Sequence, residues 1–409
     1  MRSWEHGEIP VLGDPAPATS LLIFDSAKQK MQPIVQDLDP HSDFRMYVCG
    51  ITPYDAAHLG HASTYIAFDL LQRAVRDLGF GVHYVQNITD VDDPLLERAL
   101  ITGDHWSELA EREIARFRDD MQALGVIPPA EFLGVVESMS AISSMIDQLR
   151  NTGAAYQVDQ DWYFDTSMDS AFGLISQLSH DAMMQVFAER GGDPARAGKK
   201  NSLDPLLWMA RRDSDPYWES PMGQGRPGWH VECVAIATAM LGVEFDLQGG
   251  GSDLIFPHHQ MCDSLARVQF GQPFATFYAH TGMVALDGEK MSKSKGNLEF
   301  VSRLREQGND PMAIRLALMA QHYRSDWEWK PELLERATAR LQRWRSALAR
   351  DTTPDVGQLV SDLRSALSQD LDSPAALDFV DQWANTSGDD LTGSQRAADA
   401  INALLGVRL

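Results

Sequence analysis

The chain has 409 residues, of which 44% are hydrophobic, and 58 acidic against 35 basic side chains give it a formal net charge of −23. This length predicts two or three domains, and the acidic excess argues against a broad surface for nucleic acid. No apolar stretch is long enough to cross a membrane, and no signal-peptide core follows the N-terminus. Because three cysteines form no secreted disulfide framework, we expect a soluble protein of the reduced cytoplasm.

The first part of the chain predicts the start of an α/β domain. Residues 1–42 are expected to form a polar leader with one short hairpin. A strand at 44–48, a helix at 61–78 with apolar residues at helical spacing, and a strand at 81–88 follow in order. This order is typical of one parallel βαβ unit.

The remaining pattern predicts an insertion and then a helical end. Residues 105–200 are expected to form the insertion, with two amphipathic helices and a hairpin. A strand near 206–208 should resume the alternation of strands and helices, and the sequence becomes helical throughout after about residue 310. We therefore predict an α/β catalytic domain at 43–310 and an all-helical domain at 311–409.

His58 and His61 stand between a predicted strand and a predicted helix, with Gly60 between them. The unpaired N–H groups and the dipole of a helix N-terminus favour an anion, and the two imidazoles add donors for phosphate oxygens. Gly60 lets a flat nucleotide base approach the backbone. The alternative is a histidine helix cap followed by an ordinary loop glycine.

A second basic motif puts Lys290, Lys293 and Lys295 close together in an otherwise acidic chain. Such a loop can neutralise a departing pyrophosphate, although a solvated charge run is the commoner role of clustered lysines. Together the two motifs resemble the paired signatures of class I aminoacyl-tRNA synthetases, whose catalytic domain activates an amino acid as its adenylate. The resemblance implies a Rossmann-like domain with a parallel sheet.

All three cysteines, Cys49, Cys233 and Cys262, lie in or beside glycine-rich or histidine-rich segments. Cys49, Cys233 and His258 offer two thiolates and an imidazole, which suit Zn²⁺. Their wide separation is unlike a zinc ribbon and is typical of a substrate site built from several loops, with one ligand position open. Such an ion selects a thiol over a hydroxyl substrate. The alternative is that these residues are unrelated members of the core.

The chain also resembles cysteinyl-tRNA synthetase across residues 45–300. The matching segments follow one another in the expected order, at 47–55, 58–61, 86–93, 228–233, 249–259 and 290–294. The resemblance implies one zinc ion per chain, L-cysteine as a substrate, and ATP as the second substrate, with Mg²⁺.

Some features depart from the synthetase. Cys262 stands where that family has a glutamate, and the region after Asp310 is short for a stem and an anticodon-binding domain. The loop 189–194 resembles a signature of the cysteine ligases of the mycothiol pathway. These features favour a ligase that forms cysteinyl-adenylate and passes cysteine to the amine of glucosaminyl-inositol, giving an amide, AMP and diphosphate. A compact cysteinyl-tRNA synthetase is the alternative, and an inactive paralogue that only binds is a third.

The resemblance implies a role for each motif residue. The catalytic residues, which hold the triphosphate and stabilise its departing charge, are His58, His61, Lys290 and Lys293. The residues expected to bind cysteinyl-adenylate are Cys49, Gly50, Ile51, Thr52, Thr64, Asn87, Ile88, Thr89, Trp229, Gly251, Ser252, Asp253 and Val284. The zinc ligands are Cys49, Cys233 and His258.

One of these assignments, Trp229, and one neighbouring residue, Cys262, have two interpretations each. Asp253 would accept hydrogen bonds from ribose hydroxyls, and Trp229 is either a wall beside the substrate or a core residue. Cys262 either adds a fourth zinc ligand, one helical turn from His258, or packs nearby. The expected partners are the small-molecule substrates alone, with no nucleic acid or membrane, and we expect a monomer.

Overall fold

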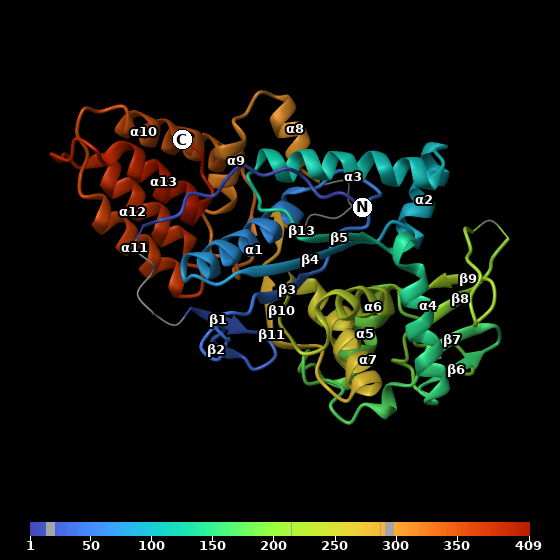
Figure 1. The fold of residues 1–409 in the computed structure, drawn as a ribbon. Coiled ribbons are helices and arrows are strands. Elements are labelled where there is room, and N and C mark those ends of the chain that lie inside the picture. Colours follow the sequence, from blue (N-terminus) through green and yellow to red (C-terminus); the bar gives the residue numbers. More distant parts are fainter. Residues whose placement is uncertain (14–20, 214, 287, 291–297) are drawn as a thin grey trace.

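The computed structural model describes the chain except at residues 14–20, 214, 287 and 291–297 (Figure 1). A central parallel sheet carries helices on both faces. A chain segment that forms a separate antiparallel sheet is inserted between its strands in the sequence, and the C-terminal region is helical. This is the predicted α/β architecture with its helical end. Among the described residues, no helix is long and apolar enough to span a bilayer.

Five parallel strands form the central sheet, in the order β11-β10-β3-β4-β5. They are β3 (Phe44–Val48), β4 (Val82–Ile88), β5 (Glu131–Gly134), β10 (Phe245–Gly251) and β11 (Ala275–Thr281). Most residues of β3 and β4 are buried on both faces, as parallel strands require. The strand order reverses between β3 and β10, so their carboxyl ends border the crevice where open α/β sheets bind ligands.

Helices on the two faces of the sheet build two separate cores (Figure 1). One face carries α1 (Leu59–Asp77), α2 (Asp93–Thr102) and α3 (Trp106–Ala123), and the other carries α4 (Val135–Asn151), α6 (Trp229–Leu241) and α7 (Gln260–Phe270). Helix α1 matches the helix predicted at 61–78. The predicted βαβ unit is therefore β3-α1-β4.

The insertion expected at 105–200 begins later in the structure. Strand β5 pairs in parallel with β4, and α3 and α4 pack on the two faces of the central sheet. An antiparallel sheet then follows, in the order β6-β7-β8-β9. Its strands are β6 (Ala155–Val158), β7 (Asp161–Phe164), β8 (Leu206–Ala210) and β9 (Gly225–Pro227). We therefore propose that the insertion spans 155–227.

One sequence expectation changes with this boundary, and one strand was not predicted. The strand near 206–208 is β8 of the antiparallel sheet, so it does not resume the α/β alternation. Strand β5 has only four residues and includes a charged Glu131 and a terminal Gly134, so it lacks the apolar run by which a buried strand is predicted. The inserted segment also contains η1 (Thr166–Met168) and α5 (His180–Glu189).

The N-terminal leader is attached to the body. The predicted hairpin is present as β1 (Leu22–Asp25) and β2 (Lys30–Pro33), which pair antiparallel. Ahead of it, the Trp4 side chain is buried, and its indole N–H donates to the Val126 carbonyl at 2.7 Å. Its ring lies edge-on against Phe117 and Phe132, with centroid separations of 5.7 and 5.8 Å. Apolar and aromatic packing therefore fixes a segment whose composition is polar.

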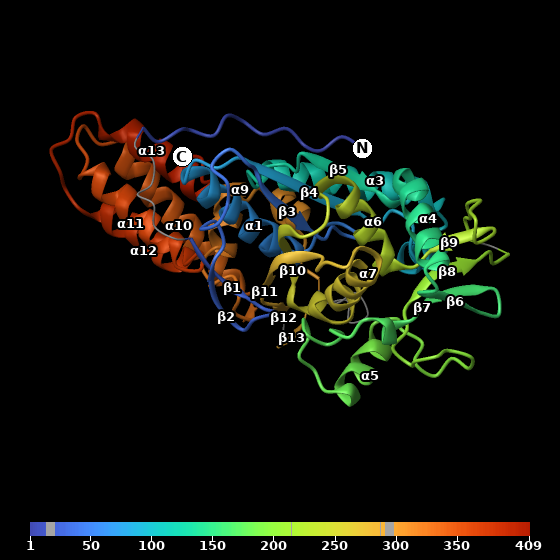
Figure 2. The same ribbon diagram turned by 60° about the horizontal axis from the view of Figure 1, so that its bottom comes forward.

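The C-terminal region is a layer of helices packed against α1 (Figure 2). It comprises α8 (Val301–Glu306), α9 (Pro311–Leu318), α10 (Pro331–Leu348), α11 (Val356–Ser368), α12 (Ser373–Asn385) and α13 (Gly393–Leu405). A small sheet of β12 (Val284–Leu286), β13 (Glu289–Lys290) and β14 (Trp327–Glu328) precedes and joins it. These helices all begin near or after residue 301, in agreement with the helical region predicted from about residue 310.

A buried ionic cluster ties this helical layer to the sheet domain. Asp69 of α1 accepts hydrogen bonds from Arg73 Nε at 2.8 Å and from Arg315 of α9. All three side chains are fully buried. Arg315 Nε also donates to the Leu405 carbonyl at 2.8 Å, so α1, α9 and α13 meet at one point.

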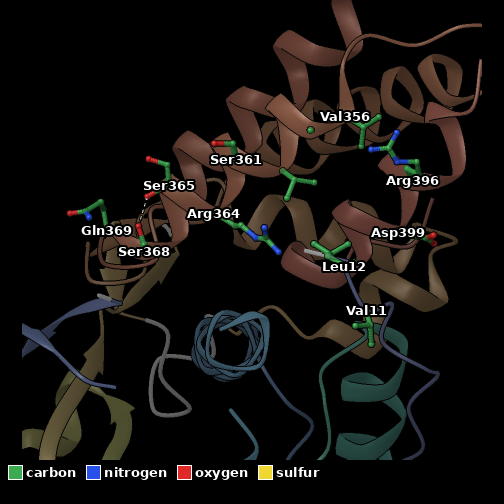
Figure 3. A pocket seen from close by; sticks show the side chains of 13 residues that line it. Val11, Leu12, Val356, Ser361, Arg364, Ser365, Ser368, Gln369, Arg396 and Asp399 are labelled. Atoms are coloured by element: carbon green, nitrogen blue, oxygen red, sulfur yellow. Dashed lines mark hydrogen bonds between the residues drawn. The ribbon is translucent and has the colours of Figure 1, made fainter. Parts of the chain in front are cut away.

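A cavity of about 490 Å³ lies between residues 11–13 and helices α11 and α13 (Figure 3). Its lining includes Ser361, Ser365 and Arg364, and Arg364 is already engaged with Asp77 through two contacts of 2.8 Å. None of the residues singled out by the motifs lines it. Most of the motif residues that the structure describes line instead a pocket at the crevice of the central sheet.

Candidate active site

The candidate site is a pocket of about 350 Å³ at the carboxyl ends of β3 and β10. It lies where the strand order of the sheet reverses, beside the N-terminus of α1. The sequence-predicted residues that line it are Cys49, Gly50, Ile51, Thr52, His58, His61, Thr64, Trp229, Gly251, Asp253 and Val284. Gly60, which was expected to lie against the nucleotide, also lines it, and the lining residues absent from the prediction are Tyr54, Tyr65, Leu254, Gly282, Met283 and Leu298.

The two motif histidines occupy the start of α1. His58 is the N-cap, and its Nδ1 accepts a hydrogen bond from the Gly60 N–H at 3.1 Å. Its ring stacks on that of His61 at a centroid distance of 3.7 Å. Both rings line the pocket. The capping role and the pocket role, which the sequence leaves as alternatives, are therefore both present in His58.

Asn87 and Thr89 support the pocket wall from behind. The Asn87 Oδ1 accepts hydrogen bonds from the Gly50 N–H and the Tyr47 hydroxyl, each at 2.9 Å. The Thr89 N–H donates to the Ile51 carbonyl at 3.0 Å. Both side chains are buried and neither lines the pocket. Their contacts hold the loop after β3 in place, whereas the sequence analysis expected them to touch the adenylate.

Gly50 has a steric reason to be glycine. A Cβ atom on this residue would lie 1.6 Å from the Asn87 carbonyl oxygen, far inside contact distance. Ile88, also expected in the site, is fully buried and does not line the pocket. The loop after β3 and the end of β4 therefore approach more closely than any side chain permits.

The remaining residues predicted for the site differ in whether they line the pocket. Thr64 on α1 lies 2.8 Å from Thr281 of β11, hydroxyl to hydroxyl, at the pocket. Ser252 does not line the pocket although its neighbours Gly251 and Asp253 do. Lys290 belongs to β13, where its backbone is paired with Ala285. Lys293 lies outside the described residues.

Cys49, Cys233 and His258 come together as predicted. Their sulfur and imidazole nitrogen atoms all lie within 4.8 Å of one another, and all three residues are buried. His258 Nε2 lies 3.2 Å from Cys233 Sγ. The residues come from the loop after β3, from α6, and from η3 (Ile255–His259), so the fold assembles a potential metal-binding cluster from three distant segments.

Burial shifts the pKa values of two members of this cluster, Cys233 and His258. It raises the pKa of the Cys233 thiol, and the neighbouring Cys49 adds to that rise. It lowers the pKa of His258, so the imidazole is neutral and has a lone pair for a ligand. A bound cation favours thiolates, so metal binding would release thiol protons here.

Cys262 is separate from the cluster. Its sulfur lies 3.6 Å from the His230 carbonyl oxygen, and its side chain is part of the apolar core on the α6–α7 side of the sheet. It is not in the group formed by Cys49, Cys233 and His258. Of the two interpretations left open by the sequence, the structure agrees with packing.

The sequence indicated no role for three histidines near the cluster, His230, His259 and His280. His230 Nδ1 lies 3.0 Å from His258 Nδ1, which directs the other nitrogen of His258 toward Cys233. His259 Nε2 lies 3.3 Å from Cys49 Sγ, and its Nδ1 lies 2.7 Å from His280 Nε2. His230 and His259 lie within the matching segments 228–233 and 249–259, next to Trp229 and His258, whereas His280 lies in none of the quoted segments.

Trp229 lies at the surface of the pocket, and its position beside a substrate stays a prediction. Its ring stacks on His258 at a centroid distance of 4.2 Å and an interplanar angle of 22°, and it also lines the pocket. Trp229 therefore contacts the Cys/His cluster through His258 and the pocket through its own surface. A thiol could reach the cluster beside this ring, while a nucleotide could occupy the part near α1 and Asp253.

Comparisons with known proteins identify the class. Residues 36–339 match the family model for the class I (C) tRNA synthetase catalytic domain. Among solved structures, Mycobacterium tuberculosis methionyl-tRNA synthetase with methionyl-adenylate aligns with a TM-score of 0.59 over 90% of this chain and 88% of its own, at 15% identity. An Agrobacterium radiobacter LeuRS complex with tRNA and LeuAMS aligns with a TM-score of 0.60 over 90% and 83%, at 11% identity. The fold is that of a class I synthetase.

Curated relatives narrow the family. The chain is 56% identical over its full length to the L-cysteine:1D-myo-inositol 2-amino-2-deoxy-alpha-D-glucopyranoside ligase of Kribbella flavida, and the whole of that protein is covered. It is also 56% identical to the ligase of Thermomonospora curvata and 54% identical to that of Streptomyces coelicolor, and in both comparisons the two chains are covered in full. Within the class I synthetase fold, the chain belongs to this ligase family.

Proposed function

We propose that the protein is an ATP-dependent ligase that activates L-cysteine as cysteinyl-adenylate. It then transfers the cysteinyl group to the amine of 1D-myo-inositol 2-amino-2-deoxy-α-D-glucopyranoside, here called glucosaminyl-inositol. Full-length identity of 54–56% to ligases named for these substrates carries the proposal. The pocket supports it, because a Cys/His cluster suited to sulfur lies beside a helix N-terminus suited to phosphate.

The chemistry has two steps. In the first, a cysteine carboxylate oxygen attacks the α-phosphorus of ATP and diphosphate leaves. In the second, the sugar amine attacks the acyl carbon, AMP leaves with the electrons of the broken C–O bond, and the amine loses a proton. His58 and His61, at the N-terminus of α1, are proposed to hold the triphosphate. Lys290 and Lys293 are proposed to stabilise the charge on the diphosphate. ATP is proposed to bind with Mg²⁺.

Zinc is the metal proposed for the cluster of Cys49, Cys233 and His258. Two thiolates and a neutral imidazole suit a tetrahedral zinc site with one position open, and burial keeps His258 neutral. When bound, zinc supplies a soft Lewis acid for a sulfur ligand, which favours cysteine over serine. Trp229, stacked on His258, is proposed to confine the cysteine side chain.

The remaining proposals concern partners. We propose a cytoplasmic monomer that uses only small molecules, because the excess of 58 acidic over 35 basic side chains disfavours binding to the phosphate backbone of tRNA. A compact cysteinyl-tRNA synthetase is the alternative, since the matching family model is that of a tRNA synthetase catalytic domain. Only the acceptor distinguishes the two enzymes.

The first half of the proposal is tested by isotope exchange between diphosphate and ATP. Purified protein should catalyse exchange with L-cysteine, and the rate with L-serine at equal concentration should be lower by a factor of about 100 or more. Removal of bound zinc by a chelator should abolish the cysteine-dependent rate, and added zinc should restore it. Equal exchange with serine would contradict selection by a sulfur-binding metal.

A further inference from the structure

The backbone between β10 and α7 needs support from outside itself. It forms η2 (Ser252–Leu254) and η3, and the residue Phe256 within it has extended torsion angles, φ −137° and ψ 135°. In a continuous helix the Asp253 carbonyl would accept from residue 257, but that residue is Pro257, which has no N–H. The Asp253 carbonyl therefore has no helical donor at that position.

Arg190 supplies a donor from the inserted segment. Its Nη1 donates to the carbonyl oxygens of both Asp253 and Phe256. Because an amide carbonyl paired with a guanidinium makes a charge-assisted hydrogen bond, these contacts are stronger than neutral ones. They join two points of a segment that carries the pocket residue Asp253 at one end and His258 at the other.

Apolar packing brings Arg190 to this position. Helix α5, which ends one residue before Arg190, places Met183 and Phe187 against Phe256 and Met261 in a small core of their own. The inserted segment is therefore seated directly on the backbone that Arg190 holds. The hydrophobic contact sets the distance, and the guanidinium sets the orientation of the carbonyls.

The residues after Arg190 fix the loop in one conformation. Gly191 has φ +86°, which side chains other than glycine rarely adopt, and a Cβ on Gly192 would lie 2.6 Å from the Phe187 ring. The Asp193 carboxylate accepts from the Tyr163 hydroxyl at 2.5 Å and from Lys199 at 2.9 Å. The loop is thus anchored to β7, and Arg190 has a rigid base.

We propose that Arg190 is a positioning residue of the ligase: by holding the carbonyls of Asp253 and Phe256 it fixes the nucleotide-binding side of the pocket. The inference rests on the proposed function, because it assigns ATP to the part of the pocket that Asp253 lines. Arg190 itself does not line that pocket. Its effect reaches the substrate through the backbone.

The test compares Arg190→Ala with Arg196→Ala. Arg196 belongs to the same inserted segment but pairs with Asp161 at 2.8 Å and with Asp159 at 3.4 Å, away from the pocket. It therefore controls for general loosening of the insertion. For each full-length protein we would measure the Kd for ATP by calorimetry, zinc per chain, and cysteine-dependent diphosphate exchange, with and without added guanidinium ion.

Arg190→Ala should weaken ATP binding about tenfold and lower the kcat/KM of exchange by a similar factor. Zinc content should equal that of the wild type, millimolar guanidinium should restore most of the ATP affinity, and Arg196→Ala should bind ATP normally. Unchanged ATP affinity in Arg190→Ala, an equal loss in Arg196→Ala, or no recovery with guanidinium would overturn this inference alone. Wild-type protein that binds no ATP would overturn the proposed function, and this inference with it.

Discussion

Replacing Asp69 with asparagine tests how the helical C-terminal region is joined to the sheet. The Asp69 carboxylate accepts from Arg73 Nε and the Ile127 N–H, each at 2.8 Å, and from Arg315. Asparagine keeps the size of the side chain but leaves two buried guanidinium groups without their counter-charge. Breaking a buried ion pair in this way costs about 3–5 kcal/mol. We therefore expect Asp69→Asn to lower the free energy of unfolding by about that amount.

The assay is urea denaturation followed by circular dichroism, at pH 7. Asp378→Asn is the matched control, because Asp378 pairs with Arg340 at 3.1 Å but its side chain is 69% exposed. Exposed pairs contribute less than about 1 kcal/mol, so this variant should unfold at nearly the wild-type urea concentration. If Asp69→Asn loses no more stability than Asp378→Asn, the claim that a buried cluster joins the two regions is refuted.

The same cluster predicts an acid dependence. Burial alone would raise the pKa of Asp69, but Arg73 and Arg315 outweigh it and lower the pKa to about 2. Burial lowers the pKa of Arg315 to about 10 despite the pull of Asp69, which still leaves it protonated at neutral pH. A lowered carboxyl pKa stabilises the fold above the unfolded pKa, near 4, and this stabilisation is lost as the pH falls toward 2. The stability difference between wild type and Asp69→Asn should therefore shrink over that interval.

The remaining predictions concern the pocket. Cys233→Ala should lose bound zinc and Cys262→Ala should keep it, because Cys233 belongs to the Cys/His cluster and Cys262 does not. Metal analysis after dialysis measures this, and equal zinc content in the two variants would contradict it. Gly50→Ala should abolish cysteine-dependent exchange, since its Cβ would overlap the Asn87 carbonyl, and wild-type exchange would be contrary to the geometry. Trp229→Ala should raise the KM for cysteine about tenfold with little change in that for ATP, and a reversed pattern would place the cysteine elsewhere.

The sequence predicted the elements whose patterns are long or regular. Strands β3 and β4 and helix α1 follow directly from apolar runs and helical spacing. Strand β5 was missed because it has only four residues, among them a glutamate and a glycine, and so shows no apolar run or alternation. Its pairing with β4 is a tertiary contact that the local sequence does not indicate. The burial of Trp4 was equally hidden, because its partners Phe117 and Phe132 lie more than a hundred residues away.

In the site, motif spacing predicted which residues meet but not how they are held. Cys49, Cys233 and His258 were found from their segments, and the structure brings them together. Asn87 was expected to contact the adenylate, and that contact stays a prediction; in the structure its amide oxygen accepts from the Gly50 backbone and the residue does not line the pocket. Such orientation depends on the packing of two loops against each other, which residue types alone do not encode.

The central claim is that cysteine is transferred to a sugar amine. The most direct measurement is mass analysis of the products after purified protein is incubated with ATP, L-cysteine, glucosaminyl-inositol and total tRNA together. The account predicts a cysteinyl amide of glucosaminyl-inositol, with one AMP formed per amide and uncharged tRNA. Cysteinylated tRNA, with the glucosaminyl-inositol recovered unchanged, would contradict it.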